Sequence, residues 1–270
     1  MYPKREIAEN GKATTNPVEI ADALNTFYVN IGKSVENKIP KGKTPISNYL
    51  QNRNIFNITL NPCTHDEVRK YISDISAVSK ATGPNSIPIP ILKSNIDQLI
   101  DQIMSILNKS LAEGTFSDLL KLASACPIYK KNDRTKCANY RPISLLSNLS
   151  KIFERTMYNR IERFLSEFDT LYRHQFGFRK KPSTEHTLLS IVEEIRKNLD
   201  NYIFTCGVFI DLEKAFDTVN HKILLSKLDH YGIRDNALKW LTSYLTNRKQ
   251  FVKLNGSQSK NGNICCGVPQ

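Results

Sequence analysis

The chain has 270 residues and a mass of 30.8 kDa, so it can bury a substantial core in one large domain or two ordinary ones, and a short disulfide-stapled peptide is excluded. Its 40% hydrophobic and 24% charged residues exclude disordered and collagen-like classes, and the longest nearly apolar stretch, residues 202–210, is about half as long as a membrane-spanning helix. The net charge of +12 favours a polyanionic partner, although a solubilising basic surface would give the same excess.

The first 62 residues predict a tail, one helix and a linker. Residues 1–15 are polar and have no hydrophobic period, and no secretory signal is present, so we expect an intracellular protein. Asn16 and Pro17 offer a helix N-cap and a proline in the first turn, and apolar residues then recur at helical spacing. Prolines and polar residues between positions 39 and 61 end this period and indicate a linker.

Residues 63–120 predict a helical lead-in to a larger domain. Amphipathic helices are expected at residues 64–75 and 96–111, and the second should end near Gly114. A loop with three prolines at residues 81–90 separates them, because proline fixes φ and has no backbone N–H.

Residues 121–270 predict a mixed set of helices and strands. A hairpin is expected from strands at 124–129 and 141–146, and a second one from 250–254 and 263–266. Helices are expected from Ser147 or Asn148 onward and at residues 184–199, 222–231 and 237–246. Residues 121–181 hold seven Lys and seven Arg against five acidic residues, so most of the excess positive charge lies there.

Residues 202–212, with the sequence YIFTCGVFIDL, predict a fully buried central strand that ends on an acid. A carboxylate at the carboxyl end of a central strand lies at the rim of the sheet, where ligands bind, and Mg²⁺ takes one or two carboxylates plus substrate phosphates. Asp211 is therefore a candidate metal ligand. The alternative interpretation is that Asp211 simply ends a strand and begins a turn.

Four blocks in a fixed order carry a resemblance to a known family. They are Asn139-Tyr-Arg-Pro-Ile-Ser-Leu-Leu146, Gln175-Phe-Gly-Phe-Arg179, Phe209-Ile-Asp-Leu-Glu-Lys-Ala-Phe-Asp-Thr-Val219 and Gly267-Val-Pro-Gln270. Together they resemble the reverse transcriptases of non-LTR (LINE-type, jockey-like) retrotransposons, with the third block similar to motif A and the fourth to the opening of motif B. The Gly83-Pro84 loop is similar to the opening segment of that domain.

The resemblance implies a mixed α/β fold: the fingers and an incomplete palm of a right-hand polymerase, preceded by an N-terminal helical extension. Residues 1–62 would join an upstream endonuclease to the polymerase, residues 63–120 would be its helical lead-in, and residues 121–270 would be the reverse transcriptase domain. Motif C, which carries two adjacent aspartates, and the thumb are missing. We therefore expect a truncated gene model or a partial element copy, with an exposed sheet edge and low solubility.

The resemblance also assigns roles at motif A. Asp211 would be a Mg²⁺ ligand of a two-metal site, and the carbonyl of Leu212 would help to hold the second ion. Phe216 would be the steric gate that excludes a ribose 2′-hydroxyl; the alternative is an ordinary core aromatic. Asp217 is interpreted as structural, as a cap of the following helix.

Further roles concern the nucleotide and the template. Lys130 or Lys131 and Arg141 would meet the incoming triphosphate, although an ordinary basic turn would contain the same lysines. Gln270 would lie under the nascent base pair. Contact with the template backbone would come from Gln175, Arg179, Lys180 and Lys181. The histidines have no metal-ligand spacing and are interpreted as ordinary residues.

The implied activity is that of an RNA-directed DNA polymerase, a nucleotidyltransferase with two Mg²⁺ ions that extends a DNA primer on an RNA template with deoxynucleoside triphosphates. A nuclear location and no membrane contact follow from the resemblance, while the oligomeric state is left open. No Asp-Asp pair occurs in the chain, so we expect it to be inactive alone. The alternative is a non-catalytic basic nucleic-acid-binding module. A Mg²⁺ phosphotransferase of another family lacks support because there is no Gly-rich phosphate loop.

Overall fold

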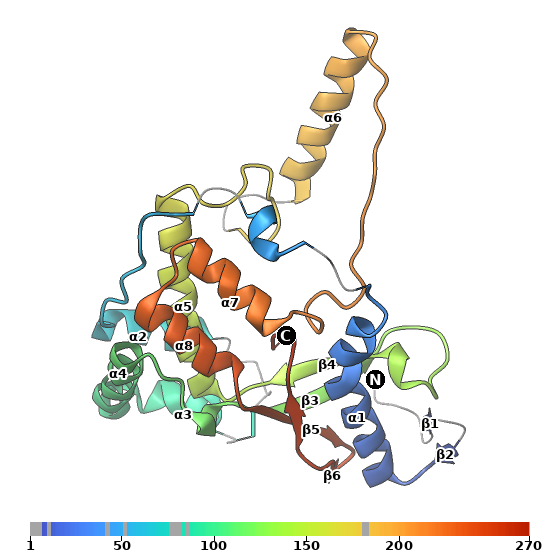
Figure 1. The fold of residues 1–270 in the computed structure, drawn as a ribbon. Coiled ribbons are helices and arrows are strands. Elements are labelled where there is room, and N and C mark those ends of the chain that lie inside the picture. Colours follow the sequence, from blue (N-terminus) through green and yellow to red (C-terminus); the bar gives the residue numbers. More distant parts are fainter. Residues whose placement is uncertain are drawn as a thin grey trace. The chain divides into compact units, whose positions relative to one another are not determined.

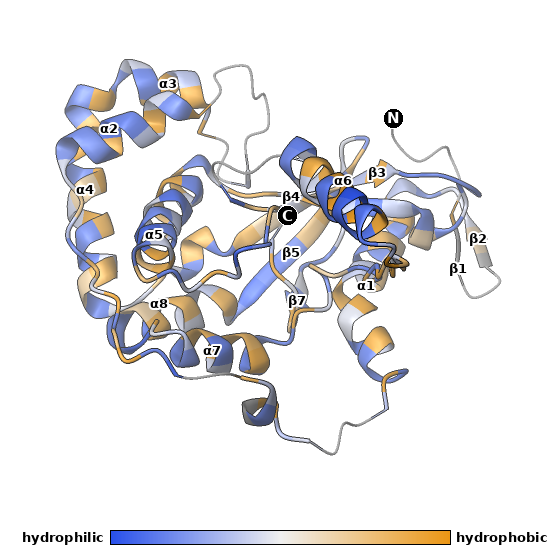
Figure 2. Ribbon diagram, turned by 90° about the horizontal axis from the view of Figure 1, so that it is seen from above, coloured by the Kyte–Doolittle hydropathy of each residue, from blue (hydrophilic) through white to orange (hydrophobic). Residues whose placement is uncertain are grey.

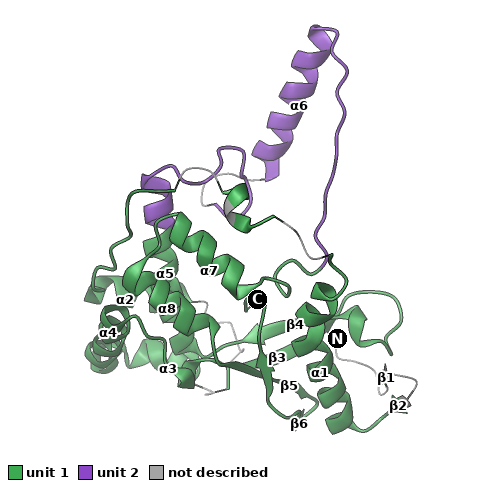
Figure 3. Cartoon of the chain, in the orientation of Figure 1, with its two compact units in different colours: residues 1–161, 214–270 green, residues 162–213 purple. Residues whose placement is uncertain are grey.

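The computed structural model describes residues 7–9, 12–40, 44–50, 53–75, 83–84, 87–179 and 184–269. The chain forms two compact units (Figure 3): unit 1 comprises residues 1–161 and 214–270, and unit 2 comprises residues 162–213.

Helices and strands are mixed along the described chain (Figure 1). The helices are α1 (Pro17–Glu36), α2 (His65–Asp74), α3 (Ile89–Ser94), α4 (Ile96–Glu113), α5 (Asn148–Glu167), α6 (Thr184–Asp200), α7 (His221–His230) and α8 (Asp235–Leu245). The strands are β1 (Ile7–Glu9), β2 (Lys12–Thr14), β3 (Leu122–Tyr129), β4 (Tyr140–Leu145), β5 (Arg248–Leu254), β6 (Ser257–Gln258) and β7 (Gly262–Ile264). The mixed α/β fold class is therefore confirmed.

Local signals set the ends of several helices. The Asn16 side chain accepts a hydrogen bond from the Val18 N–H at the start of α1. Thr64 and Glu67 form a reciprocal capping box at the start of α2. α4 ends at Gly114, whose φ of 64° is left-handed. All three helices confirm the sequence-based expectation.

The sheet of unit 1 has the strand order β4-β3-β5-β6, and β7 also pairs with β5. β3 and β4 are antiparallel with Cys126 opposite Ile143, and β5 and β7 are antiparallel with Lys249 opposite Asn263, so both expected hairpins are confirmed. β3 and β5 run parallel. The sequence did not predict this pairing, which joins the two hairpins into one sheet.

Helix α1 packs on this sheet. Its apolar face shares a core with sheet residues; the buried members are Ile7, Ile20, Ala21, Leu24, Tyr28, Ile31, Ala125, Cys137, Tyr140, Val252 and Leu254. The prediction of an irregular tail over residues 1–15 is wrong for the described part, because β1 and β2 pair with Ala8 opposite Ala13. Ile7 is completely buried, and burial of an apolar side chain stabilises this short hairpin where local propensity does not.

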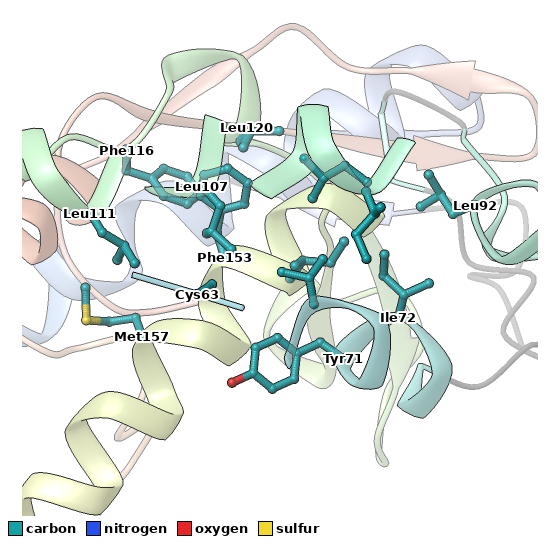
Figure 4. Packing of buried hydrophobic residues seen from close by; sticks show 14 of the residues in the cluster. Cys63, Tyr71, Ile72, Leu92, Leu107, Leu111, Phe116, Leu120, Phe153 and Met157 are labelled. Carbon is teal, nitrogen blue, oxygen red and sulfur yellow. The ribbon is translucent and has the colours of Figure 1, made fainter. Parts of the chain in front are cut away.

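A second core joins helices of unit 1 that carry both hydrophobic and hydrophilic residues (Figure 2). Its members in Figure 4 come from α2 to α5 and the loops beside them, and include Cys63, Tyr71, Ile72, Leu92, Leu107, Leu111, Phe116, Leu120, Phe153 and Met157. The Phe116 ring makes edge-to-face contacts with Phe153 and Trp240, with centroids 6.0 and 5.1 Å apart. Trp240 Nε1 donates to Ser110 Oγ at 2.9 Å, so the indole is buried with its polar atom satisfied.

The Gly83-Pro84 loop packs closely against the chain between β4 and α5. A Cβ atom at Gly83 would collide with the backbone of Leu146 and Ser147, at the junction of β4 and α5. Only glycine permits this approach of two backbones.

The prediction of a buried central strand at residues 202–212 is wrong. Residues 203–212 form no strand, and the side chains of Phe204, Phe209 and Ile210 are at least 85% exposed. A central strand exists only where neighbours supply hydrogen bonds on both sides, and no described strand pairs with this segment. In the same unit, α6 has no buried residue.

Candidate nucleotide site

Two segments that are distant in sequence meet in unit 1: residues 214–221, which form a turn and the first residue of α7, and the segment 267–269. The Gly267 N–H donates to the Val219 carbonyl at 2.8 Å, and the Val268 N–H donates to the Phe216 carbonyl at 2.9 Å. His221 Nε2 lies 2.7 Å from the Gly267 carbonyl oxygen. Three hydrogen bonds therefore attach the second segment to the turn, and we call this contact the turn junction.

The turn junction requires glycine at position 267. Gly267 has a φ of +80°, and a Cβ atom there would lie 2.8 Å from the carbonyl oxygen of Asp217 and 3.0 Å from its Cα. Both the backbone angle and the lack of space exclude a side chain.

Phe216 and Asp217 lie in the turn with different exposure. The Phe216 side chain is 43% exposed, so it is not a fully buried core aromatic. Asp217 is half-buried, and burial raises the pKa of its carboxyl, while the cations of Lys214 and Arg141 oppose the increase. Arg141 is therefore close enough to act electrostatically on the turn.

The predicted role of Asp217 as a helix cap is wrong. Asn220 caps α7 instead, because its Oδ1 accepts from the N–H groups of Lys222 and Ile223 at 3.0 and 3.2 Å. Asn220 immediately precedes the helix, whereas Asp217 is too far back along the chain to reach the first free N–H groups.

The β3–β4 hairpin presents the predicted triphosphate-binding cations. The Lys130 N–H donates to the Asn139 carbonyl at 2.8 Å, which closes the hairpin, and the side chains of Lys130, Lys131 and Arg141 are exposed. The Arg134 guanidinium lies 4.7 Å from the centre of the Tyr129 ring in the same loop. The structure thus places the three predicted cations on one hairpin of unit 1.

The remaining predicted residues lie in unit 2 or outside the described residues. Asp211 and Leu212 are exposed in the irregular segment that precedes residue 213. Gln175 is exposed in a turn in which its N–H donates to the Tyr172 carbonyl at 2.9 Å, and Arg179 is half-buried. Lys180, Lys181 and Gln270 lie outside the described residues.

Residues 128–270, more than half of the chain, match the family model described as reverse transcriptase (RNA-dependent DNA polymerase). The chain belongs to the reverse transcriptase family. The match covers the β3–β4 hairpin from Ile128 onward and all three hydrogen bonds of the turn junction.

Relatives of the chain come from mobile elements. A probable RNA-directed DNA polymerase from transposon BS of Drosophila melanogaster is 29% identical over 99% of this chain and 29% of its own length. The RNA-directed DNA polymerase from mobile element jockey of the same species is 30% identical over 83% of this chain and 24% of its own length. A probable RNA-directed DNA polymerase from transposon X-element, also of D. melanogaster, is 33% identical over 71% and 21%. The chain therefore spans less than a third of each relative, and the expected resemblance to the non-LTR, jockey-like type is confirmed.

Reverse transcriptases as a family use divalent metal ions, so the carboxylates of this chain must be tested for such a site. Among the described residues, no group of three or more His, Cys, Asp or Glu side chains lies close enough to hold an ion. Asp211 supplies one carboxylate, and two ions need more negative charge than that. The described residues therefore do not by themselves supply the ligands of a two-metal site. Separately, no helix in the described ranges combines the length and apolarity that crossing a membrane requires.

The sequence did not reveal the contact of His221 with Gly267 and left this residue as an ordinary histidine. The available signal was its position, as the first residue of the helix that follows the motif A block.

Proposed function

We propose that this chain is the fingers and part of the palm of an RNA-directed DNA polymerase, which adds deoxynucleotides to a primer 3′-end on an RNA template. The turn junction carries the proposal, because it joins the end of the motif A block to the opening of motif B within the family-matched region. The nuclear location of a retrotransposon enzyme is part of the same proposal.

Cations of the β3–β4 hairpin would bind the incoming triphosphate. Arg141 has the planar fork that suits phosphate oxygens, and Lys130 or Lys131 would act as a point charge. Their exposure supports this role, since a phosphate can reach them without desolvating a buried ion pair. The proximity of Arg141 to Asp217 places its charge near the turn that holds Phe216.

Phe216 would be the gate against the ribose 2′-hydroxyl. Its ring is partly exposed, and its own carbonyl accepts the Val268 N–H, so backbone bonding fixes the position from which the ring projects. Gln270, which follows Pro269 in the sequence, would lie under the nascent base pair. Template contact is assigned to Gln175, Arg179, Lys180 and Lys181, which would bind phosphates without reading sequence.

The metal would be Mg²⁺, with two ions in the full-length enzyme. Asp211 and the Leu212 carbonyl offer the hard oxygen ligands that Mg²⁺ prefers, but they are incomplete without further carboxylates. We therefore propose that the 270-residue chain alone does not polymerise DNA, and that a version extended through an aromatic-x-Asp-Asp block does. Below, this version is called the extended chain.

A non-catalytic nucleic-acid-binding module is the second candidate. The absence of a three-ligand cluster from the described residues favours it, together with the exposed cations of the hairpin. A salt-dependent affinity of the 270-residue chain for RNA, with no polymerisation by the extended chain, would decide for this candidate.

The polymerase proposal is tested by primer extension with the extended chain on an RNA template. The wild type should incorporate deoxynucleotides and reject ribonucleotides, whereas Phe216→Val should accept ribonucleotides at least tenfold better, because the smaller side chain leaves room for the 2′-hydroxyl. Phe204→Val is the matched control, since Phe204 is exposed and lies outside the turn junction. Unchanged sugar selectivity in Phe216→Val would contradict the gate.

A further inference from the structure

The His221 ring bonds to the one glycine that the turn junction requires. Its Nε2 atom lies 2.7 Å from the Gly267 carbonyl oxygen. Because a carbonyl oxygen can only accept, Nε2 must carry the hydrogen and donate it. The ring itself is held at a capped helix end, since Asn220 bonds to the N–H groups of Lys222 and Ile223.

The other two hydrogen bonds of the turn junction hold N–H groups of the segment, and the His221 ring adds a restraint on a carbonyl group. Both of them use N–H groups of the segment, those of Gly267 and Val268, and both acceptors are backbone carbonyls of the turn. The Val268 N–H belongs to the same planar peptide as the Gly267 carbonyl, so the Phe216 carbonyl restrains one side of this peptide and a hydrogen bond to the Gly267 carbonyl restrains the other. The His221 ring holds that carbonyl.

We propose that His221 is a positioning residue of the nucleotide site. By fixing the Gly267 carbonyl, it sets the place of Val268 and Pro269 relative to Phe216. The proposal rests on the proposed polymerase function, in which Phe216 and Gln270 contact the nucleotide while His221 contacts neither nucleotide nor metal.

A first experiment measures the hydrogen bond without catalysis. Hydrogen–deuterium exchange of the Gly267 and Val268 amides is followed in the 270-residue wild type, His221→Leu and His221→Gln. Loss of one hydrogen bond should speed exchange about three- to tenfold in His221→Leu. His221→Gln should retain protection, because its amide N–H₂ group reaches about as far as Nε2.

The matched control is His230→Leu, the same substitution at the other end of α7. His230 lies at the far end of the helix from the turn junction, so exchange at Gly267 and Val268 should not change. Equal protection in wild type and His221→Leu would overturn the proposal, and the protected Gln variant shows that α7 still folds when the ring is absent.

A second experiment separates positioning from simple stabilisation. In the extended chain, His221→Leu should raise KM for deoxynucleotides and lower the preference for deoxynucleotides over ribonucleotides about tenfold, with kcat changed less than KM. His221→Gln should restore both. A faster exchange with unchanged selectivity would show that the bond exists but positions nothing. An extended wild type with no polymerase activity would overturn the function and this role together, while the exchange result would still stand for the hydrogen bond.

Discussion

At the scale of single residues, Gly267 shows how a backbone contact restricts the amino acid. Its φ is +80° and a Cβ atom would meet the Asp217 backbone. Gly256 has a similar φ of +83°, but a Cβ atom there would have nothing within 4 Å. A side chain would be strained by the positive φ at both positions, but only at position 267 would its Cβ atom also collide with neighbouring backbone.

Gly267→Ala should therefore destabilise unit 1 more than Gly256→Ala. We expect about 1 kcal/mol for the positive φ at either site and roughly 1–3 kcal/mol more at position 267, where the backbone must move. Urea unfolding of the 270-residue variants measures both losses. Equal losses would show that Asp217 and Gly267 do not approach as described.

The Asp217 carboxyl, which lies at the turn junction, makes the free energy of unfolding depend on pH. Burial raises the pKa of its carboxyl above the unfolded value, so the folded state binds the proton more tightly than the unfolded state. The favourable contribution is complete below the unfolded pKa and is lost as the pH rises through the folded pKa. At neutral pH the ionised carboxylate is a cost to folding.

Asp217→Asn should remove this dependence. Relative to wild type, the variant should gain stability between pH 4 and pH 7, because it has no charge to desolvate. Urea unfolding at the two pH values gives the difference, and Asp200→Asn, at an exposed carboxylate, serves as the control. A gain that is the same at both pH values would mean that the pKa of Asp217 is not raised.

At the scale of elements, local signals and long-range pairings differed in how well the sequence predicted them. The caps at Asn16 and Thr64 and the stop at Gly114 depend on neighbouring residues, and their helices were predicted. The parallel pairing of Ala125 with Val252 joins distant segments, and periodicity carries no information about it. The prediction of a central strand at residues 202–212 was wrong because a strand also needs a pairing partner. The sequence pattern of a strand is present, but no described strand pairs with this segment.

The residues of the candidate site were likewise predicted where a local motif marks them and missed where a long-range contact does. The motif blocks identified Arg141, Phe216 and Gly267 as members of one family pattern, and the structure places all three in unit 1. The bond from His221 to Gly267 was not predictable, because it depends on how the chain returns after two helices and a hairpin.

Trp240 packs helix α8 against the rest of the core. Its indole contacts Phe116 and donates to Ser110, both outside α8, and stacks on Tyr244 of the same helix with centroids 5.5 Å apart. Trp240→Ala should lower the free energy of unfolding by about 3–5 kcal/mol, since it leaves a large cavity and removes the hydrogen bond to Ser110. Urea unfolding tests this, with Leu119→Ala as the control because Leu119 is 82% exposed. A loss below about 1 kcal/mol would contradict the packing described.

At the scale of the molecule, the positive charge of the chain is concentrated in a stretch that overlaps the family-matched region. Seven Lys and seven Arg lie in residues 121–181, a stretch that includes the β3–β4 hairpin, and the family match begins at residue 128. In the proposed polymerase, Asp211 is the carboxylate of the motif A block that binds metal. The polymerase account therefore depends on whether Asp211 acts together with carboxylates beyond this sequence.

Primer extension on an RNA template, with Mg²⁺ and deoxynucleotides, tests that dependence most directly. The 270-residue chain is compared with the extended chain and with its Asp211→Ala and Glu213→Ala variants; Glu213 is a nearby exposed acid with no assigned role. We predict label incorporation by the extended wild type and by Glu213→Ala, and none by Asp211→Ala or by the 270-residue chain. Extension by the 270-residue chain itself would contradict this account, because other carboxylates within it would then have to complete the metal site.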